Sequence, residues 1–212
     1  MNIALQLLAY SGQALSTPVL LGILNNYQRP YDKIVELVKQ GYLLQLRKGL
    51  YTSSSLISSI QPEPFLIANH LYGPSYISLD SALFYWGLIP ERVFEQTSVS
   101  TKASKRFLSQ GISYSFTHLP KDYYPIGIQS VQLAEGQTVL MASPEKALCD
   151  KIITTAGVNL RSKLQTQTWL LEDLRIEKED LKNLNLKEMH TWLPNSPKRN
   201  SLSILIKTIA EF

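Results

Sequence analysis

Residues 41–52 read GYLLQLRKGLYT, and this stretch decides how the first part of the chain folds. Two short runs rich in apolar residues, 42–47 and 50–52, lie on either side of Lys48-Gly49. Such runs around a glycine-containing turn predict a hairpin of two antiparallel strands. Gly41 comes just before the hairpin and suits the end of a helix, because glycine tolerates positive φ.

Three short helices are predicted upstream of this hairpin. Apolar residues begin the first at residues 3–8, and the second follows Ser16 or Thr17, whose hydroxyl can cap free N–H groups. The third covers residues 30–40, where apolar side chains recur at i, i+3 and i+4. Helices followed by a two-stranded hairpin are the layout of a winged helix-turn-helix, which we expect at residues 1–54.

Basic side chains gather on the parts of this layout that reach DNA. Residues 1–52 hold five Lys or Arg against two acidic residues, whereas residues 53–101 hold one against four. The third helix would read bases in the major groove, and the hairpin tip would contact flanking phosphates. A helical subdomain that binds no nucleic acid is the alternative. The residues predicted to contact double-stranded DNA are Thr17, Gln28, Arg29, Tyr31, Lys33, Lys39, Arg47 and Lys48.

A serine-rich stretch at residues 53–59, followed by two prolines, predicts a hinge between two domains. With 44% hydrophobic residues, the chain has enough apolar material for a second core at residues 61–212. That region mixes predicted strands (76–79, 97–101, 112–118, 128–133 and 138–142) with helices at 65–71, 81–86 and from Ser143 onward. It is expected to be helical after about residue 160. The expected fold class is therefore α+β, with a mixed α/β second domain and a helical tail.

The sequence offers no catalytic or metal-binding constellation. Its three histidines lack metal-ligand spacing, and its glycines form no phosphate-binding loop. Cys149 lies on an apolar helix and is expected to be an inert buried thiol, and a single cysteine excludes a disulfide framework. No apolar run is long enough for a membrane span. We therefore expect a cytoplasmic protein that is not an enzyme and needs no cofactor.

Taken together, the hairpin, residues 73–91 (GPSYISLDSALFYWGLIPE) and residues 142–152 (ASPEKALCDKI) resemble the AbiEi antitoxins. These are antitoxin-repressors of bacterial abortive-infection and type IV toxin–antitoxin systems. The resemblance spans residues 1 to about 155 and implies that residues 30–40 are the recognition helix. It also implies repression of the protein's own operon through inverted repeats. Binding to such repeats is compatible with a homodimer on DNA.

The same resemblance implies that the second domain counteracts a nucleotidyltransferase-like toxin without requiring a stable complex. The segments GPSY (residues 73–76) and SPEKAL (residues 143–148) are expected to serve the fold of that domain, with Lys146 and Asp150 on the outer face of a helix. A stand-alone winged-helix regulator without a toxin is the alternative, and the role of the tail is open.

Overall fold

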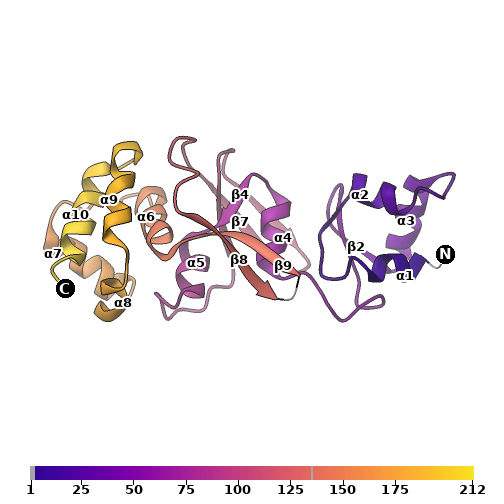
Figure 1. Ribbon diagram of the computed structural model, residues 1–212, viewed down its shortest axis with the longest axis horizontal. Helices are drawn as coiled ribbons and strands as arrows, with labels where there is room; N and C mark the ends of the chain where they lie inside the picture. Colours follow the sequence, from indigo (N-terminus) through magenta and orange to yellow (C-terminus); the bar gives the residue numbers. More distant parts are fainter. Residues whose placement is uncertain (1–2, 135) are drawn as a thin grey trace.

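The computed structural model describes residues 3–134 and 136–212 as an elongated α+β molecule (Figure 1). A small unit of helices and strands forms the N-terminal end, a six-stranded sheet lies in the middle, and helices form the C-terminal end. Buried apolar residues gather in two clusters, one inside the N-terminal unit and a larger one that extends through the sheet and the C-terminal helices.

The N-terminal unit has the three helices and the hairpin that the sequence predicts. Its buried apolar residues include Ile34 and Leu37 of the third helix, on the side that the i, i+3 spacing predicts. Gly41 has a φ of +78°, as expected where the chain leaves a helix for a strand. In chain order the elements are α1 (Ile3–Leu8), β1 (Leu15–Ser16), α2 (Thr17–Ile23), α3 (Pro30–Lys39), β2 (Leu43–Arg47) and β3 (Leu50–Ser53).

Two local details of this unit differ from the prediction. Ser16 is the N-cap residue of α2, but its hydroxyl makes no capping hydrogen bond. Instead, Leu15 and Ser16 form the short strand β1, which pairs antiparallel with β3 and makes the hairpin a three-stranded sheet of order β1-β3-β2. The backbone of Ser16 therefore belongs to the sheet, just before the helix begins.

The central sheet has the strand order β6-β7-β5-β4-β9-β8, with parallel pairs β5/β7 and β4/β9 and antiparallel pairs elsewhere. Helix α4 (Pro64–Leu71) lies toward the N-terminal unit, and α5 (Leu79–Tyr85) lies toward the C-terminal helices (Figure 1). The strands are β4 (Ser75–Ile77), β5 (Gln96–Ser100), β6 (Lys105–Ser109), β7 (Ile112–His118), β8 (Ile128–Ala134) and β9 (Gln137–Ala142).

Most strands occur where they were predicted, but β6 was missed and the start of α5 was misplaced. Asp80 does not cap α5; the N-cap residue is Ser78, and Asp80 lies in the first turn. There its carboxylate forms an ion pair with Lys151 at 2.7 Å. The prediction failed because Asp80 is a good capping residue type, while its actual partner lies 71 residues further on.

The C-terminal end is helical, as predicted. Ser143 caps α6 (Pro144–Thr154) by accepting a hydrogen bond from the backbone N–H of Lys146. The apolar side of α10 (Arg199–Ile209) is buried. Between them lie α7 (Lys163–Thr168), the π-helix η1 (Trp169–Asp173), α8 (Lys178–Lys182), α9 (Leu186–Trp192) and the 3₁₀-helix η2 (Leu193–Asn195). Within the described residues, no helix is both long and apolar enough to cross a membrane.

The serine-rich stretch after β3 is packed at its start rather than free. Ser53 and Ser54 are buried, and the Ser53 hydroxyl donates to the Leu7 carbonyl at 3.3 Å. Further along, buried Gln137 of β9 accepts from the Glu63 N–H at 2.7 Å and donates to the Gln61 carbonyl at 3.0 Å. The predicted hinge is therefore fastened at both ends.

The tips of two hairpins of the central sheet also contact the N-terminal unit. In the β6–β7 hairpin, the Ser109 hydroxyl donates to the Leu46 carbonyl at 2.8 Å. At the β8–β9 tip, the Gly136 carbonyl accepts from the Gln13 side chain at 2.9 Å. Leu46 and Leu50, from β2 and β3, belong to the larger apolar cluster rather than to the N-terminal one. These contacts set the orientation of the two units.

Candidate nucleic-acid interface

Helix α3 presents a stripe of three side chains that stay exposed among the described residues. Tyr31 is 64% exposed and Val35 is 53% exposed, and Lys39 follows at the same spacing of four residues. Residues four apart lie on one face of a helix, so the three form a line about 12 Å long. This line combines an aromatic ring, a branched apolar group and a cation, which suit contacts with base edges and phosphates.

The predicted cations of α3 differ in how far they are neutralised. Lys33 donates to Glu36 at 2.7 Å, a hydrogen bond that lowers the pKa of the Glu36 carboxyl. Arg29 approaches Asp32 at 4.0 Å, with both side chains largely exposed. Lys39 has no carboxylate within ion-pair distance among the residues that the structure describes. The helix therefore carries less free positive charge than its count of basic residues indicates.

The hairpin tip carries two further cations without a carboxylate partner. Arg47 and Lys48 are exposed, and neither has an ion-pair partner among the described residues. Gly49 completes the turn with a φ of +82°, and its carbonyl accepts from the Thr17 N–H at 3.0 Å. This bond places the start of α2 beside the hairpin tip, so Thr17, Arg47 and Lys48 lie at one place in the molecule.

The remaining predicted contacts lie at the start of α3. Gln28, Arg29 and Tyr31 are exposed there, whereas Lys39 is near the other end of the helix, about 13 Å along its axis. Val35 was not among the predicted contacts, although it is an apolar residue outside the buried i, i+3, i+4 set. Its position could have indicated a contact surface, because an apolar residue on the polar side of a helix does not pack into the core.

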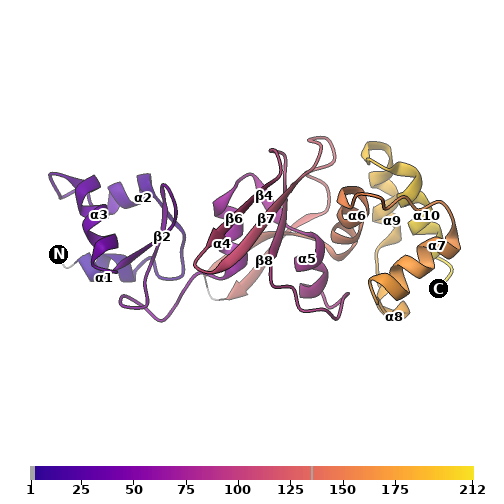
Figure 2. The ribbon, with the colours of Figure 1, turned by 180° about the vertical axis from the view of Figure 1, so that it is seen from behind.

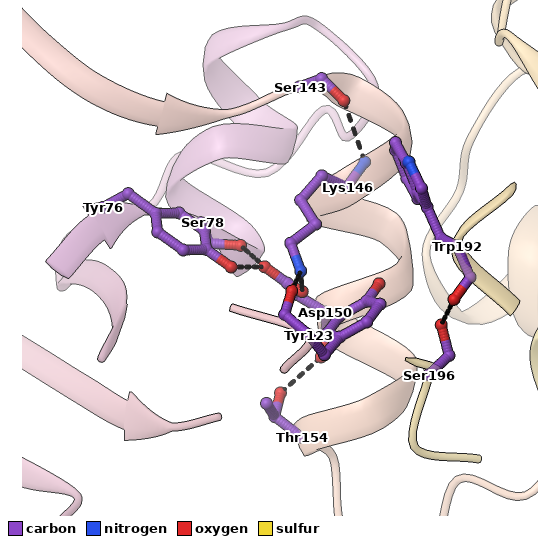
Figure 3. A network of polar contacts seen from close by, with 9 residues as sticks. All are labelled: Tyr76, Ser78, Tyr123, Ser143, Lys146, Asp150, Thr154, Trp192 and Ser196. Carbon is purple, nitrogen blue, oxygen red and sulfur yellow. Dashed lines mark hydrogen bonds and ion pairs between the residues drawn. The ribbon is translucent and has the colours of Figure 1, made fainter. Parts of the chain in front are cut away.

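A second polar cluster lies at the centre of the second unit, where Lys146 and Asp150 were expected on an outer helix face (Figure 3). That expectation is wrong. Both side chains are 0% exposed, and the Lys146 Nζ lies 3.0 Å from Asp150 Oδ1. The pair is spaced i, i+4 on α6, a spacing usually found on solvated faces. Here the face turns inward against β4 and the segment before β8.

The partners of this pair come from distant parts of the chain. Asp150 Oδ2 accepts from the Tyr76 hydroxyl at 2.9 Å and from the Ser78 hydroxyl at 2.7 Å. The Lys146 Nζ also donates to the Tyr123 carbonyl at 3.1 Å and lies 3.3 Å from the centre of the Tyr123 ring. Figure 3 shows these groups converging on one point between the strand, the loop and the helix.

Burial dominates the titration behaviour of this cluster. It raises the pKa of the Asp150 carboxyl, against the opposing influence of Lys146 and the two hydroxyls, and it lowers the pKa of the Lys146 ammonium. Burial also raises the pKa of the neighbouring Cys149 thiol to about 12, which agrees with the prediction of a buried thiol. Since none of these side chains is open to solvent, the cluster ties elements together and offers no reacting group at the surface.

The two segments that carry the family resemblance meet at this cluster. Tyr76 and Ser78 belong to residues 73–91, whereas Lys146 and Asp150 belong to residues 142–152. A second link, the ion pair between Asp80 and Lys151, joins the same two segments. Each segment supplies polar groups that the other must satisfy, since an unpaired buried charge is costly. Within the described residues, no group of three or more His, Cys, Asp or Glu is placed to hold a metal ion.

No protein-family model and no curated protein sequence matches the chain. Among solved structures, the chain is similar to the RV2827C protein from Mycobacterium tuberculosis. The match has a TM-score of 0.60 and 15% sequence identity, and it covers 98% of this chain and 75% of that chain. At this identity the similarity concerns the fold, and it supports the α+β class along nearly the whole chain.

Proposed function

We propose that the protein is a DNA-binding transcriptional regulator whose N-terminal unit acts as a winged helix-turn-helix. In this proposal α3 lies in the major groove and the β2–β3 hairpin is the wing. The order of helices and strands is the one such a domain requires. The observation that carries the proposal is the pair of exposed cations Arg47 and Lys48 at the hairpin tip, beside the start of α2, which have no ion-pair partner in residues 3–134 and 136–212.

The experiment measures binding to a duplex from the region upstream of the protein's own reading frame. The variant Arg47→Gln/Lys48→Gln removes two phosphate contacts, so the slope of log K against log salt should become shallower by about 1.8. The control, Lys187→Gln/Lys207→Gln, removes the same charge from exposed positions on α9 and α10. If both variants bind like the wild type, with the same slope, the hairpin does not contact DNA.

The bases should be read by α3 rather than by the hairpin. Replacing Tyr31 or Val35 by Ala should reduce the preference for the upstream duplex over a duplex of scrambled sequence. The salt slope should stay the same, because neither residue contacts a phosphate through a charge. An equal loss of affinity for both duplexes would show that these side chains do not read sequence.

The resemblance to the AbiEi antitoxins leads to a proposal for the second unit: it counteracts a nucleotidyltransferase-like toxin. The buried Lys146–Asp150 cluster supports action by binding rather than by catalysis, since its ionisable groups are closed to solvent. The test co-expresses the protein with the product of a neighbouring nucleotidyltransferase gene and measures growth. If growth is not rescued, or if no such gene is present, the protein is a stand-alone regulator.

A further inference from the structure

A second group of exposed cations lies outside the N-terminal unit, on the edge strand β6 of the central sheet and the loop before it. Lys102, Lys105 and Arg106 occur within five residues that contain no acidic side chain. Arg106 is 3.5 Å from Glu95. Lys102 and Lys105 are exposed, and no carboxylate of the described part of the chain lies within ion-pair distance of either.

These lysines are held by an aromatic platform rather than by acidic partners, and the Lys102 ammonium also donates to the Gly73 carbonyl. The Lys102 Nζ lies 5.2 Å from the centre of the Tyr72 ring, and the Lys105 Nζ lies 4.9 Å from that of Phe107. The Tyr72 ring is packed against both Phe107 and Phe116, at 5.6 Å and 5.3 Å between ring centres. A cation over an aromatic face keeps its full charge, so this surface remains positive while its side chains are restrained.

The platform is fixed relative to the β2–β3 hairpin. Strand β6 runs from Lys105 to Ser109, and the Ser109 hydroxyl is bonded to the carbonyl of Leu46, the residue before Arg47. The next residue, Gln110, donates to the Gln45 carbonyl at 3.4 Å. Figure 2 shows β6 in the part of the sheet nearest the N-terminal unit. At about 3.3 Å per residue, Lys105 lies about 13 Å along the strand from the hairpin contact.

We propose that a duplex held by the β2–β3 hairpin continues over the edge of β6, where Lys102 and Lys105 contact its phosphates. The proposal rests on the proposed DNA binding and extends its contact surface onto the second unit. A distance of about 13 Å corresponds to about four base pairs of B-form DNA, which is within a single binding site. The second unit therefore takes part in DNA binding.

Lysines on an edge strand can have another role, which the experiment must separate from this one. Exposed sheet edges commonly carry lysine because its charge discourages pairing with a second sheet. If that were the role of Lys102 and Lys105, neutral substitutions would promote self-association and leave the salt dependence of DNA binding unchanged.

The experiment uses the full-length protein and a fluorescein-labelled 30-base-pair duplex of mixed sequence, between 50 and 200 mM NaCl. Lys102→Gln/Lys105→Gln should make the slope of log K against log salt shallower by about 1.8. Its affinity should consequently fall about twelvefold less than that of the wild type across this range. Lys187→Gln/Lys207→Gln should keep the wild-type slope, and Lys102→Arg/Lys105→Arg should keep it too because the charges remain.

The outcomes distinguish this proposal from the proposed function. A slope changed by the hairpin variant Arg47→Gln/Lys48→Gln, but not by Lys102→Gln/Lys105→Gln, would overturn only the extension onto β6. A wild-type protein that binds no duplex would overturn both proposals. Sedimentation of the variant as a dimer, with the wild-type salt slope, would assign the two lysines to protection of the sheet edge.

Discussion

Replacing Lys146 by Met is the perturbation whose effect the structure defines most sharply. Methionine fills most of the volume of the lysine stem but removes the ammonium, leaving the Asp150 carboxylate buried with only the Tyr76 and Ser78 hydroxyls. An unpaired buried carboxylate is so unfavourable that the group takes up a proton instead. The cost of the substitution is therefore limited by the cost of that protonation.

The loss in free energy of unfolding depends on the pH. Starting from the ordinary value of 3.8, protonating Asp150 costs about 1.36 kcal/mol per pH unit, hence about 4.4 kcal/mol at pH 7 and about 1.6 kcal/mol at pH 5. These figures are upper limits for the substitution, because burial already raises the pKa of Asp150 in the wild type. The pKa of Asp150 in the folded variant is raised above its unfolded value. The stability contributed by this group is therefore complete below pH 3.8 and is lost as the pH rises toward the folded pKa. Lys146→Met should be much less destabilising at pH 5 than at pH 7.

Urea unfolding followed by tryptophan fluorescence measures this effect. Trp86, Trp169 and Trp192 all lie in the second unit, so the signal reports the unfolding of that unit. Lys151→Met is the matched control, because Lys151 lies on the same helix in an ion pair with side chains 22% and 35% exposed. Its loss should be below about 1 kcal/mol. A Lys146→Met loss that equals the control, or that does not change between pH 5 and 7, would refute the buried pair.

Three further predictions concern the packing around this cluster and the junction between the units. Gly127→Ala should destabilise the fold by more than the roughly 1–2 kcal/mol expected for a left-handed backbone alone, because the new Cβ would lie 2.9 Å from the Lys146 Cβ. Gly157 also has a left-handed backbone but has open space around it, so in the same urea assay Gly157→Ala should cost only the roughly 1–2 kcal/mol of the backbone. The Cys149 thiol has a pKa near 9.0 in the unfolded chain and about 12 in the folded protein, so between pH 8 and pH 10 its ionisation should lower the free energy of unfolding by about 1.4 kcal/mol. Cys149→Ala should remove this part of the pH dependence. Gln137→Ala should accelerate proteolytic cleavage within residues 54–61, since it removes both of its hydrogen bonds to the far end of this segment, at Gln61 and Glu63; an unchanged cleavage rate would show that these bonds do not hold the segment.

Local patterns were sufficient to predict most of the helices and strands. The periodicity of Ile34 and Leu37 predicted α3, and Ser143 followed by proline predicted the start of α6. Strand β6 was missed because four of its five residues are basic, polar or exposed, so the usual alternation of apolar and polar residues is absent. Strand β1 has only two residues and depends on pairing with β3, which no local pattern encodes.

The cluster at Lys146 and Asp150 could not be predicted for a related reason. On the sequence, two opposite charges four residues apart on a helix indicate a solvated face. The groups that make burial tolerable, the Tyr76 and Ser78 hydroxyls, lie more than 70 residues earlier. At the proposed interface, by contrast, Arg47 and Lys48 lie at the tip of the predicted hairpin and are exposed there, and their contact with DNA stays a prediction.

The packing of Leu46 and Leu50 at the junction between the two units limits how the protein can be engineered. Both leucines lie on the β2–β3 hairpin, yet their side chains pack in the core of the second unit. A chimera that exchanged residues 1–54 for the corresponding unit of a different protein would bring in a hairpin shaped for a different neighbour, leaving apolar surface on α4 poorly covered. Transplanting the proposed DNA-contacting surface therefore requires grafting only the exposed residues of α3 and the hairpin tip, with both leucines kept in place.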